Sequence, residues 1–385
     1  MTNLATLRIP SEVIFGSGCA ETVGEQARKL GAKRALVISD QGIQKAGLVD
    51  RIESWLNKAG ISSMSYVDAE AEPSTDSVAP CLDYARQAEC DVVVGLGGGS
   101  VLDTTKAVAM LLKNEGTVED YLGNDLVQRR GVPTILMPTT AGTGSEITPN
   151  ALFYVPSRRT KEAVISPLIV TPVAMVDPVL TLSVPPSVTA ATGMDALCHA
   201  IESYTGLNAT PLSELFALEA IRLISANLRQ AVMDGQSLKA REGMALGSLY
   251  AAISLANSGT NAVHALAYPL QGLNRITHGI ANSLLLPYVM EFNLLGNLEK
   301  FAKVAEMMGQ PVGHLSLRDA AGESARACRQ LSQDVGIPQH MSDIGISAAQ
   351  MGEFVGGALK VTRLLKNNPC PIGAEDIERI YERAL

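Results

Sequence analysis

Between Gly193 and His278, four side chains have types and spacing suited to binding a metal ion. Asp195 and His199 stand four residues apart in GMDALCHAIESY, and His264 and His278 are the two ends of HALAYPLQGLNRITH. On a helix, positions i and i+4 share one face with Cβ atoms ~5–6 Å apart, so Asp195 and His199 can grip one ion together. One carboxylate and three imidazoles form a donor set that suits Fe²⁺ or Zn²⁺.

The same residues have a simpler explanation, because an aspartate four residues before a histidine is common on exposed helices. Against it stands the distribution of histidine: the chain has five, and three lie in this stretch of Ala-, Leu- and Gly-rich sequence. Buried polar groups are costly unless they are paired or bound to a metal. Cys198, between Asp195 and His199, is a further potential ligand, but its position also suits packing, which we favour.

A second set of residues is suited to binding phosphate groups. DVVVGLGGGSVLDTTK, at 91–106, reads as an apolar strand, a run of glycines and a helix whose first N–H groups and dipole favour a pyrophosphate. It lacks the Gly-Lys-Ser/Thr of a Walker loop and only approximates the dinucleotide fingerprint. MPTTAGTGSE, at 137–146, is a second loop of small and hydroxyl-bearing residues after a strand.

Asp40 ends an earlier predicted strand. There a carboxylate can bind the adenosine ribose and repel a 2′-phosphate, which favours NAD(H) over NADP(H). An aspartate at this position is equally suited to capping a helix.

These residues must be positioned by strands and helices in a particular order. Strands are predicted at 34–40, 62–68, 91–97 and 132–140, then a hairpin over 150–167 and one more strand at 173–178. Helices are predicted between the first strands, one running from a turn at Gly42 to about Lys58 and the next opened by Pro73 and Ser74. Such alternation predicts a parallel, doubly wound α/β sheet. After residue 184 the sequence changes to long helical runs. We therefore predict an NAD-binding α/β domain at 1–184 and an all-α metal- and substrate-binding domain at 185–385.

Length and composition favour a folded protein that acts on small molecules. The 385 residues are 46% hydrophobic, and a net charge of −8 argues against nucleic acid or an anionic membrane as a partner. Neither a signal peptide nor an apolar run long enough to span a membrane is recognisable. Six cysteines without a Cys-x-x-Cys motif suit a reducing compartment. We therefore expect a cytoplasmic protein.

With these residues in view, nearly the whole chain resembles the iron-activated (group III) alcohol dehydrogenase family. The resemblance rests on GGGSVLDTTK, MPTTAGTGSEIT, GMDALCHAIESY, HALAYPL, HGIANSLLLPYVM and NNPCPIGAEDI. It implies a nucleotide-binding domain followed by a helical domain, as in dehydroquinate synthase, with nicotinamide and metal in a cleft between them. It also implies an oxidoreductase that acts on CH–OH groups, with Fe²⁺ ahead of Zn²⁺ as the metal. We expect a homodimer or larger homo-oligomer.

The resemblance assigns roles to individual residues. The family's metal ligands, which we also take as its catalytic residues, fall on Asp195, His199, His264 and His278. Its cofactor-binding positions match Asp40, Gly97, Gly98, Gly99, Ser100, Asp103, Thr139, Thr140, Thr143, Asn150 and Lys161. The expected substrate pocket includes Asn150, Leu255, Tyr268 and Arg275.

Two positions depart from the family's lactaldehyde and propanediol reductases. Tyr268 replaces a second histidine four residues after His264, and Leu255 replaces a pocket aromatic nine residues before it. Tyrosine, with an ordinary pKa of ~10, is a poor base near neutral pH, and leucine leaves more room. The expected substrates are therefore short to medium primary alcohols and aldehydes. Arg275, near His278, keeps open an anionic substrate that carries a carboxylate, phosphonate or sulfonate.

The predicted reaction is hydride transfer between the carbinol carbon and NAD(H), with the metal polarising the substrate oxygen. A dehydroquinate-synthase-like lyase would use similar parts, but it needs many basic residues, and positions 243–278 contain only Arg275. A protein that binds metal or nucleotide without turnover is a further alternative. It would not oxidise NADH with any aldehyde.

Overall fold

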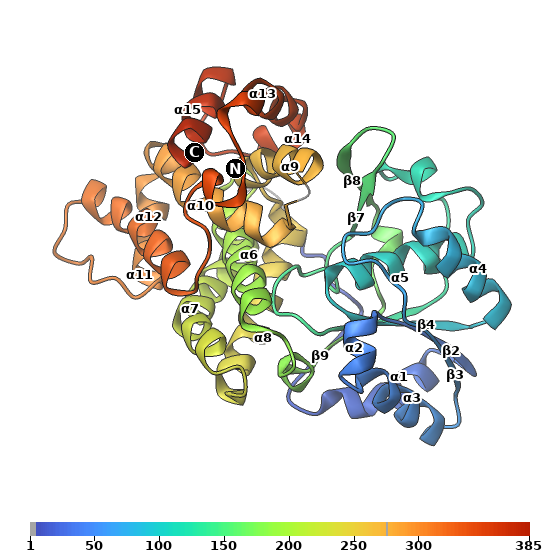
Figure 1. Ribbon diagram of the computed structural model, residues 1–385. Coiled ribbons are helices and arrows are strands. Elements are labelled where there is room, and N and C mark those ends of the chain that lie inside the picture. Colours follow the sequence, from blue (N-terminus) through green and yellow to red (C-terminus); the bar gives the residue numbers. More distant parts are fainter. Residues whose placement is uncertain (1–4, 275) are drawn as a thin grey trace. The chain divides into compact units, whose positions relative to one another are not determined.

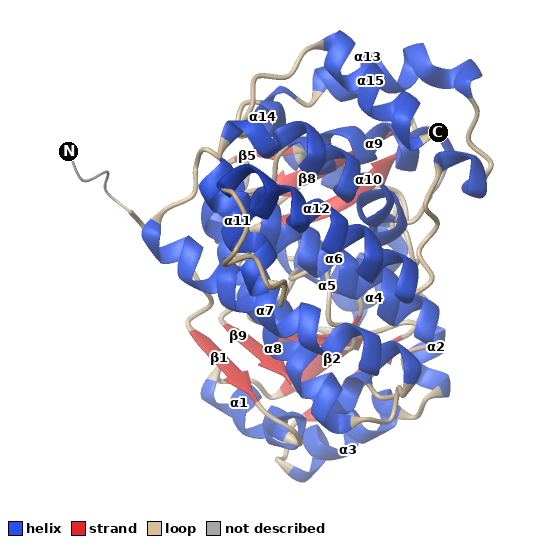
Figure 2. Cartoon of the chain, turned by 90° about the vertical axis from the view of Figure 1, so that its left-hand side faces the viewer, coloured by secondary structure: helices blue, strands red, loops and turns tan. Residues whose placement is uncertain are grey.

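The computed structural model of the chain describes residues 5–274 and 276–385 and divides into two compact units (Figure 1). One unit comprises Ile9–Val184. The other comprises Pro185–Leu385 together with the short segment that ends at Arg8. Strands occur in the first unit, and the described part of the second contains only helices and loops (Figure 2).

Ile9–Val184 is built around a six-stranded sheet in which all neighbouring strands are parallel. In spatial order the strands are β1 (Glu12–Phe15), β9 (Val173–Val176), β6 (Thr134–Pro138), β4 (Val92–Gly97), β2 (Arg34–Ile38) and β3 (Ser62–Tyr66). A smaller sheet has the order β5 (Gly123–Asn124), β8 (Thr160–Ile165) and β7 (Asn150–Val155), and β7 and β8 form the predicted antiparallel hairpin.

Alternate residues of the strands face two separate hydrophobic cores. The helices of this unit are α1 (Val23–Lys29), α2 (Gln41–Lys45), α3 (Leu48–Lys58), α4 (Val78–Ala88) and α5 (Gly99–Leu111). On β2, Leu36 and Ile38 belong to the core that contains α4 and α5. Ala35 and Val37 belong to the core that contains α1 and α3. Helices thus cover both faces of the sheet, and the prediction of a doubly wound α/β domain is confirmed.

Two local predictions for this unit were wrong, and one strand was missed. The single helix expected up to Lys58 is broken into α2 and α3, because Gly47 between them adopts a left-handed φ of 72°. The helix expected from Pro73 begins only at Val78. Instead, the Pro73 carbonyl accepts the Tyr154 N–H at 2.9 Å, so the preceding segment pairs with β7. The edge strand β1 was not predicted.

The chain changes direction across the large sheet between β2 and β4. From β2 it passes outward to β3, then returns across β2 to β4 and continues to β6 and β9. In doubly wound sheets, ligands bind beyond the carboxyl ends of the strands at such a switch point. Asp40 follows β2, and Gly97–Ser100 joins β4 to α5. Two of the predicted cofactor-binding segments therefore meet the topological requirement.

The C-terminal unit is a helical assembly. Its helices are α6 (Pro186–Thr205), α7 (Pro211–Met233), α8 (Leu238–Ser258), α9 (Ala262–Asn274), α10 (His278–Asn293), α11 (Leu298–Met307), α12 (Leu317–Asp334), α13 (Met351–Lys360), α14 (Thr362–Leu365) and α15 (Ala374–Ala384). Short 3₁₀ segments in the two units are Cys19–Thr22, Val118–Tyr121, Pro167–Ile169, Pro178–Thr181, Leu294–Gly296, Met341–Ile344 and Ala348–Gln350. Helix α6 packs against α7, α8 and α10. None of the helices in the described part of the chain has the length and apolar character of a membrane span.

Candidate active site

Three helices of the C-terminal unit supply the four predicted metal ligands. Helix α6 carries Asp195 and His199 one turn apart, α9 carries His264 in its first turn, and α10 begins at His278. Close packing holds α6 in place: a Cβ at Gly193 would lie 2.4 Å from Leu228 Cδ1 of α7. The helix thus presents both of its ligands from a rigid backbone.

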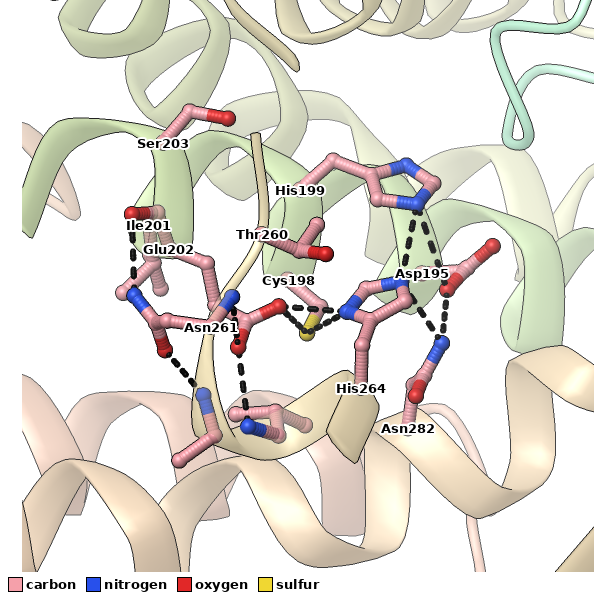
Figure 3. Close-up of polar contacts among 12 residues, drawn as sticks. Asp195, Cys198, His199, Ile201, Glu202, Ser203, Thr260, Asn261, His264 and Asn282 are labelled. Carbon is pink, nitrogen blue, oxygen red and sulfur yellow. Dashed lines mark hydrogen bonds and ion pairs between the residues drawn. The ribbon is translucent and has the colours of Figure 1, made fainter. Parts of the chain in front are cut away.

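The structure brings these four side chains together, and Figure 3 shows three of them, Asp195, His199 and His264. One donor atom from each lies within 4.8 Å of the donor atoms of the others. The Nε2 atoms of His199 and His264 are 3.1 Å apart, and Asp195 Oδ1 lies 3.9 Å from the Nε2 of His199 and 3.8 Å from that of His278. The side chain of His278 is 20% exposed, whereas that of Asp195 is 1% exposed. With His199 5% and His264 4% exposed, His278 is the most exposed of the four side chains.

Hydrogen bonds behind two of the rings turn their lone pairs towards the cluster. The Nδ1 of His264 bonds to the Glu202 carboxylate, and the Nδ1 of His278 donates to Gln271 Oε1 at 3.0 Å. When Nδ1 carries the proton, Nε2 carries a lone pair. Converging lone pairs beside a buried carboxylate need a donor or a cation among them, and the Asn282 amide, 3.1 Å from His264 Nε2 and 3.0 Å from His278 Nε2, is one such donor. The donor set therefore fits a divalent metal ion.

Asp195 is a buried anion, and the groups around it, three imidazoles and the Asn282 amide, carry no permanent charge. Burial favours a higher pKa for Asp195, but the three imidazoles and the Asn282 amide outweigh it and lower that pKa. Burial favours a lower pKa for His264, and Glu202 and Asp195 outweigh it and raise that pKa. Among the described residues, the ion-pair partners of Asp195 are imidazoles only.

In the α/β unit, the two loops rich in small residues contact each other. A Cβ at Gly97 would lie 2.6 Å from Val101 Cγ2, and one at Gly99 would lie 2.6 Å from Thr143 Oγ1. Glycine is thus required for the close approach of the chain at both positions. The Thr139 N–H donates to the Gly97 carbonyl at 3.0 Å, and its buried hydroxyl has no hydrogen-bond partner among the described residues.

Other predicted cofactor residues lie around the same strand ends. Gly98 precedes the first turn of α5, with Thr140 3.7 Å from where a Cβ on Gly98 would stand. The Ser100 hydroxyl bonds to the Ala71 carbonyl. Asp40 caps α2, since its Oδ1 accepts the Ile43 N–H at 3.0 Å. The other Asp40 oxygen has no protein partner within 5–274 and 276–385, so capping and ribose binding are compatible.

Three further predicted cofactor residues are engaged within the α/β unit itself. Asp103 accepts the Ser145 hydroxyl at 2.5 Å and the Leu152 N–H at 2.9 Å. The carbonyl of Asn150 accepts a hydrogen bond from the buried Lys106 ammonium. The Lys161 ammonium forms an ion pair with Glu72. Asp103 thus ties helix α5 to the loop after β6 and to β7.

Of the four residues predicted to line the substrate pocket, the structure describes three. Tyr268 is half-buried on α9, with its ring centroid 6.5 Å from that of His278. Leu255 is half-buried on α8, which packs against α6. Asn150 begins β7 in the α/β unit. Arg275 lies outside the described residues.

Four residues that support the two clusters were not predicted: Glu202 and Gln271 behind two of the imidazoles, Asn282 beside the ligating atoms, and Lys106 between the loops. Asn282 Nδ2 lies 2.8 Å from Asp195 Oδ1 and 3.0 Å from His278 Nε2. Helical spacing offered a signal for two of them. Asn282 is four residues after His278, and Glu202 is seven after Asp195, so each shares a face with a ligand.

Comparison with known proteins gives a consistent result across both units. The family model described as "Iron-containing alcohol dehydrogenase" matches residues 10–178, and the one described as "Fe-containing alcohol dehydrogenase family, C-terminal" matches residues 189–385. A crystal structure of 1,3-propanediol oxidoreductase is similar, with a TM-score of 0.97, 37% identity and 100% of both chains covered.

Three curated relatives are similar over nearly their whole length. Long-chain-alcohol dehydrogenase 1 of Geobacillus thermodenitrificans is 40% identical, with 99% of this chain and 97% of the relative covered. NAD-dependent methanol dehydrogenase of Bacillus methanolicus is 35% identical, covering 98% and 99%. Sulfoacetaldehyde reductase of Bilophila wadsworthia is 35% identical, covering 96% of each.

Proposed function

The chain belongs to the iron-containing alcohol dehydrogenase family and is an oxidoreductase that acts on CH–OH groups; on that premise we propose that it interconverts short to medium primary alcohols and aldehydes with NAD(H). The proposed metal ligands, and hence the catalytic residues, are Asp195, His199, His264 and His278. The single observation that carries this proposal is the convergence of their donor atoms within 4.8 Å. Fe²⁺ is the proposed metal, with Zn²⁺ as the alternative that the same donors suit.

A divalent metal bound by these residues supplies Lewis-acid chemistry, which polarises the oxygen of an alcohol or aldehyde. The chain itself contributes position and charge. Asp195 supplies the one negative charge among the four ligands, while Glu202 and Gln271 hold two imidazoles with their lone pairs inward. Partial burial raises the pKa of Tyr268, so its hydroxyl stays protonated near neutral pH and is suited to orienting a substrate oxygen.

The proposed cofactor site is the switch point of the α/β sheet. The first N–H groups of α5 would bind the pyrophosphate, with Gly97, Gly98 and Gly99 leaving room for it. The free oxygen of Asp40 would bind the adenosine ribose and disfavour a 2′-phosphate. The preference for NAD is supported by the NAD-dependent methanol dehydrogenase among the relatives. The domain roles, a homo-oligomeric state and a cytoplasmic location stay predictions.

A second candidate is the same reaction on an anionic aldehyde. It is supported by the sulfoacetaldehyde reductase among the relatives. The residue predicted to bind the anion, Arg275, carries no structural argument here because it lies outside the described residues.

The proposal is tested by turnover of metal-reconstituted protein against paired aldehydes of equal size, one neutral and one anionic, with NADH and with NADPH. We expect neutral primary aldehydes to be reduced with NADH, and Asp40→Gly to relax the preference for NADH. Equal use of NADPH by the wild type would refute the role of Asp40. Higher catalytic efficiency with the anionic member of each pair would select the second candidate.

A further inference from the structure

Glu202 lies on α6, three residues after His199, and its side chain is 2% exposed. Both of its oxygens are occupied by hydrogen-bond donors (Figure 3). Oε1 accepts the backbone N–H groups of Asn261 at 3.0 Å and Val263 at 2.8 Å. Oε2 bonds to His264 Nδ1. One carboxylate thus binds both the start of α9 and the imidazole that α9 carries.

We propose that Glu202 is a positioning residue that sets the tautomer of His264 and fixes the first turn of α9 against α6. This inference rests on the proposed function, because it concerns how one proposed metal ligand is prepared. A carboxylate offers acceptors only, so the bond between it and His264 requires the proton on Nδ1. Nε2, which faces the other ligands, is then left with a lone pair.

The backbone contacts give the same residue a second effect. Helix α9 begins at Ala262, so the N–H groups of Asn261 and Val263 belong to the end of the helix that lacks intrahelical acceptors. A carboxylate there satisfies two donors and complements the helix dipole. Asn261 Nδ2 also donates to the backbone carbonyl of Glu202 at 3.1 Å. Glu202 on α6 therefore holds both the imidazole ring of His264 and the backbone at the start of α9.

The connection between α8 and α9 is tied to its surroundings by further hydrogen bonds. The Ser203 hydroxyl donates to the Gly259 carbonyl at 3.2 Å. Asn367 Nδ2 lies 2.9 Å from the Ser258 carbonyl and 3.0 Å from the Thr260 carbonyl. Because these bonds fix the connection without Glu202, loss of the carboxylate should disturb the imidazole more than the fold.

Cys198, Glu202 and His264 also have ligand atoms within 4.8 Å of one another, which raises the alternative of a second metal site. The contacts argue against it. Both carboxylate oxygens already accept hydrogen bonds, and the Cys198 thiol lies 3.6 Å from Oε2 as a weak donor. Burial, followed by the charge of Glu202, raises the pKa of that thiol well above its usual value, so it stays protonated. The group is a hydrogen-bonded support for His264.

The substitution Glu202→Gln tests the positioning role of Glu202, because the two side chains have almost the same size and shape. A glutamine has one acceptor oxygen and one donor NH₂. If the oxygen accepts from Asn261 and Val263, the NH₂ faces His264 and favours the Nε2–H tautomer, which removes the lone pair needed for metal. If the oxygen faces His264, the NH₂ opposes two backbone N–H groups. Neither orientation reproduces what the carboxylate does.

The experiment combines two readouts on the full-length chain. Nitrogen-15 NMR of the histidine rings in chelator-treated protein, at a pH well above the ordinary imidazole pKa of ~6.5, reports each tautomer. Titration with Zn²⁺ reports affinity and stoichiometry. We expect Nδ1–H at His264 in the wild type and mainly Nε2–H in Glu202→Gln, with the other rings unchanged. Affinity for Zn²⁺ should fall by ~10–100-fold in the variant.

Cys198→Ala is the matched control, because it removes the other side chain that contacts Glu202 and leaves the carboxylate in place. It should keep the wild-type tautomer and affinity. An Nε2–H tautomer in the wild type overturns the inference even if Glu202→Gln fails to fold. The inference is also overturned if Glu202→Gln keeps the wild-type tautomer of His264 and the wild-type affinity for Zn²⁺. Two bound ions in the wild type and one in Cys198→Ala would overturn it as well. Wild type that binds no divalent ion would instead refute the proposed function.

Discussion

Two buried carboxylates, Asp103 in the α/β unit and Asp195 in the helical unit, are surrounded by different kinds of partner. Asp103 has a cation of its own, since Lys106 Nζ lies 3.3 Å from Oδ1, and it also accepts a hydroxyl and a backbone N–H. Asp195 has an amide donor at 2.8 Å and imidazoles at 3.8 and 3.9 Å. The negative charge of Asp103 is matched by the Lys106 ammonium without any ligand. Among the described residues, Asp195 has only imidazoles as ion-pair partners.

The difference separates a structural cluster from a binding one. Lys106 is itself buried, and its ammonium reaches the carbonyls of Ser145 and Asn150, so the pair fastens α5 to the loop after β6. Near Asp195, two of the three rings are held by hydrogen bonds at Nδ1 with their Nε2 lone pairs inward. Such a set, with an anion and no fixed positive charge beside it, is completed by a cation.

The comparison predicts effects of different size for the same substitution at the two sites. Asp103→Asn leaves the Lys106 ammonium buried without its anion and should lower the free energy of unfolding by about 3–5 kcal/mol. Asp195→Asn removes a carboxylate whose neighbours are imidazoles and an amide and leaves no buried ammonium unpaired, so in chelator-treated protein the fall in the free energy of unfolding should be smaller. Urea unfolding followed by circular dichroism measures both. Fluorescence of Trp55, the one tryptophan, reports on the α/β unit.

A double variant, Asp103→Asn with Lys106→Met, is the control for the first of these effects. It removes both charges and should recover part of the lost stability. If Asp103→Asn proved harmless, or Asp195→Asn destabilised the metal-free protein as much as Asp103→Asn does, the distinction between the clusters would be wrong.

Glu146, close to the Asp103–Lys106 pair, provides a pH-dependent test. Burial raises its pKa from 4.5 to about 7, with Lys106 opposing the shift. Because the folded-state pKa lies above the unfolded one, this group contributes stability fully below about pH 4.5 and loses it as the pH rises through about 7. The loss should be on the order of 1–3 kcal/mol. Glu146→Gln should remove it, giving a flatter dependence of urea stability on pH across this window; an identical slope would contradict the assignment.

The smallest expected effect on turnover is at Tyr268, whose ring centroid lies 6.5 Å from that of His278. Tyr268→Phe removes only the hydroxyl, whose pKa is raised by burial, so it is suited to orient substrate and not to accept a proton. We expect kcat/KM for aldehyde reduction to fall by less than ~10-fold. A fall of ~10²–10⁴-fold, the range of general acid–base catalysis, would show that Tyr268 transfers the proton.

The sequence predicted those parts of the molecule that depend on local spacing. Apolar runs between helices predicted the parallel sheet, and the i, i+4 relation of Asp195 and His199 predicted that they would share one helix face, as α6 shows. The sequence did not reveal two supporting contacts between residues that are distant in the chain. Lys106 meets Asn150 44 residues away, and Glu202 meets His264 62 residues away. No local pattern records such pairs, because tertiary packing decides them.

Local backbone geometry accounts for the remaining errors. The break between α2 and α3 depends on one left-handed glycine, which an amphipathic pattern does not reveal. The delayed start of α4 depends on hydrogen bonds between Pro73, Thr75 and Tyr154, where pairing with β7 overrides helix propensity.

The central claim is that the cluster around Asp195 binds one divalent metal ion that turnover requires. The most direct measurement is anaerobic titration of chelator-treated wild type with Fe²⁺, and separately with Zn²⁺, while NADH-dependent aldehyde reduction is followed. Turnover should rise from near zero and level off at one ion per chain, and Asp195→Asn should show neither tight binding nor recovery. Full turnover in the metal-free wild type would contradict the account.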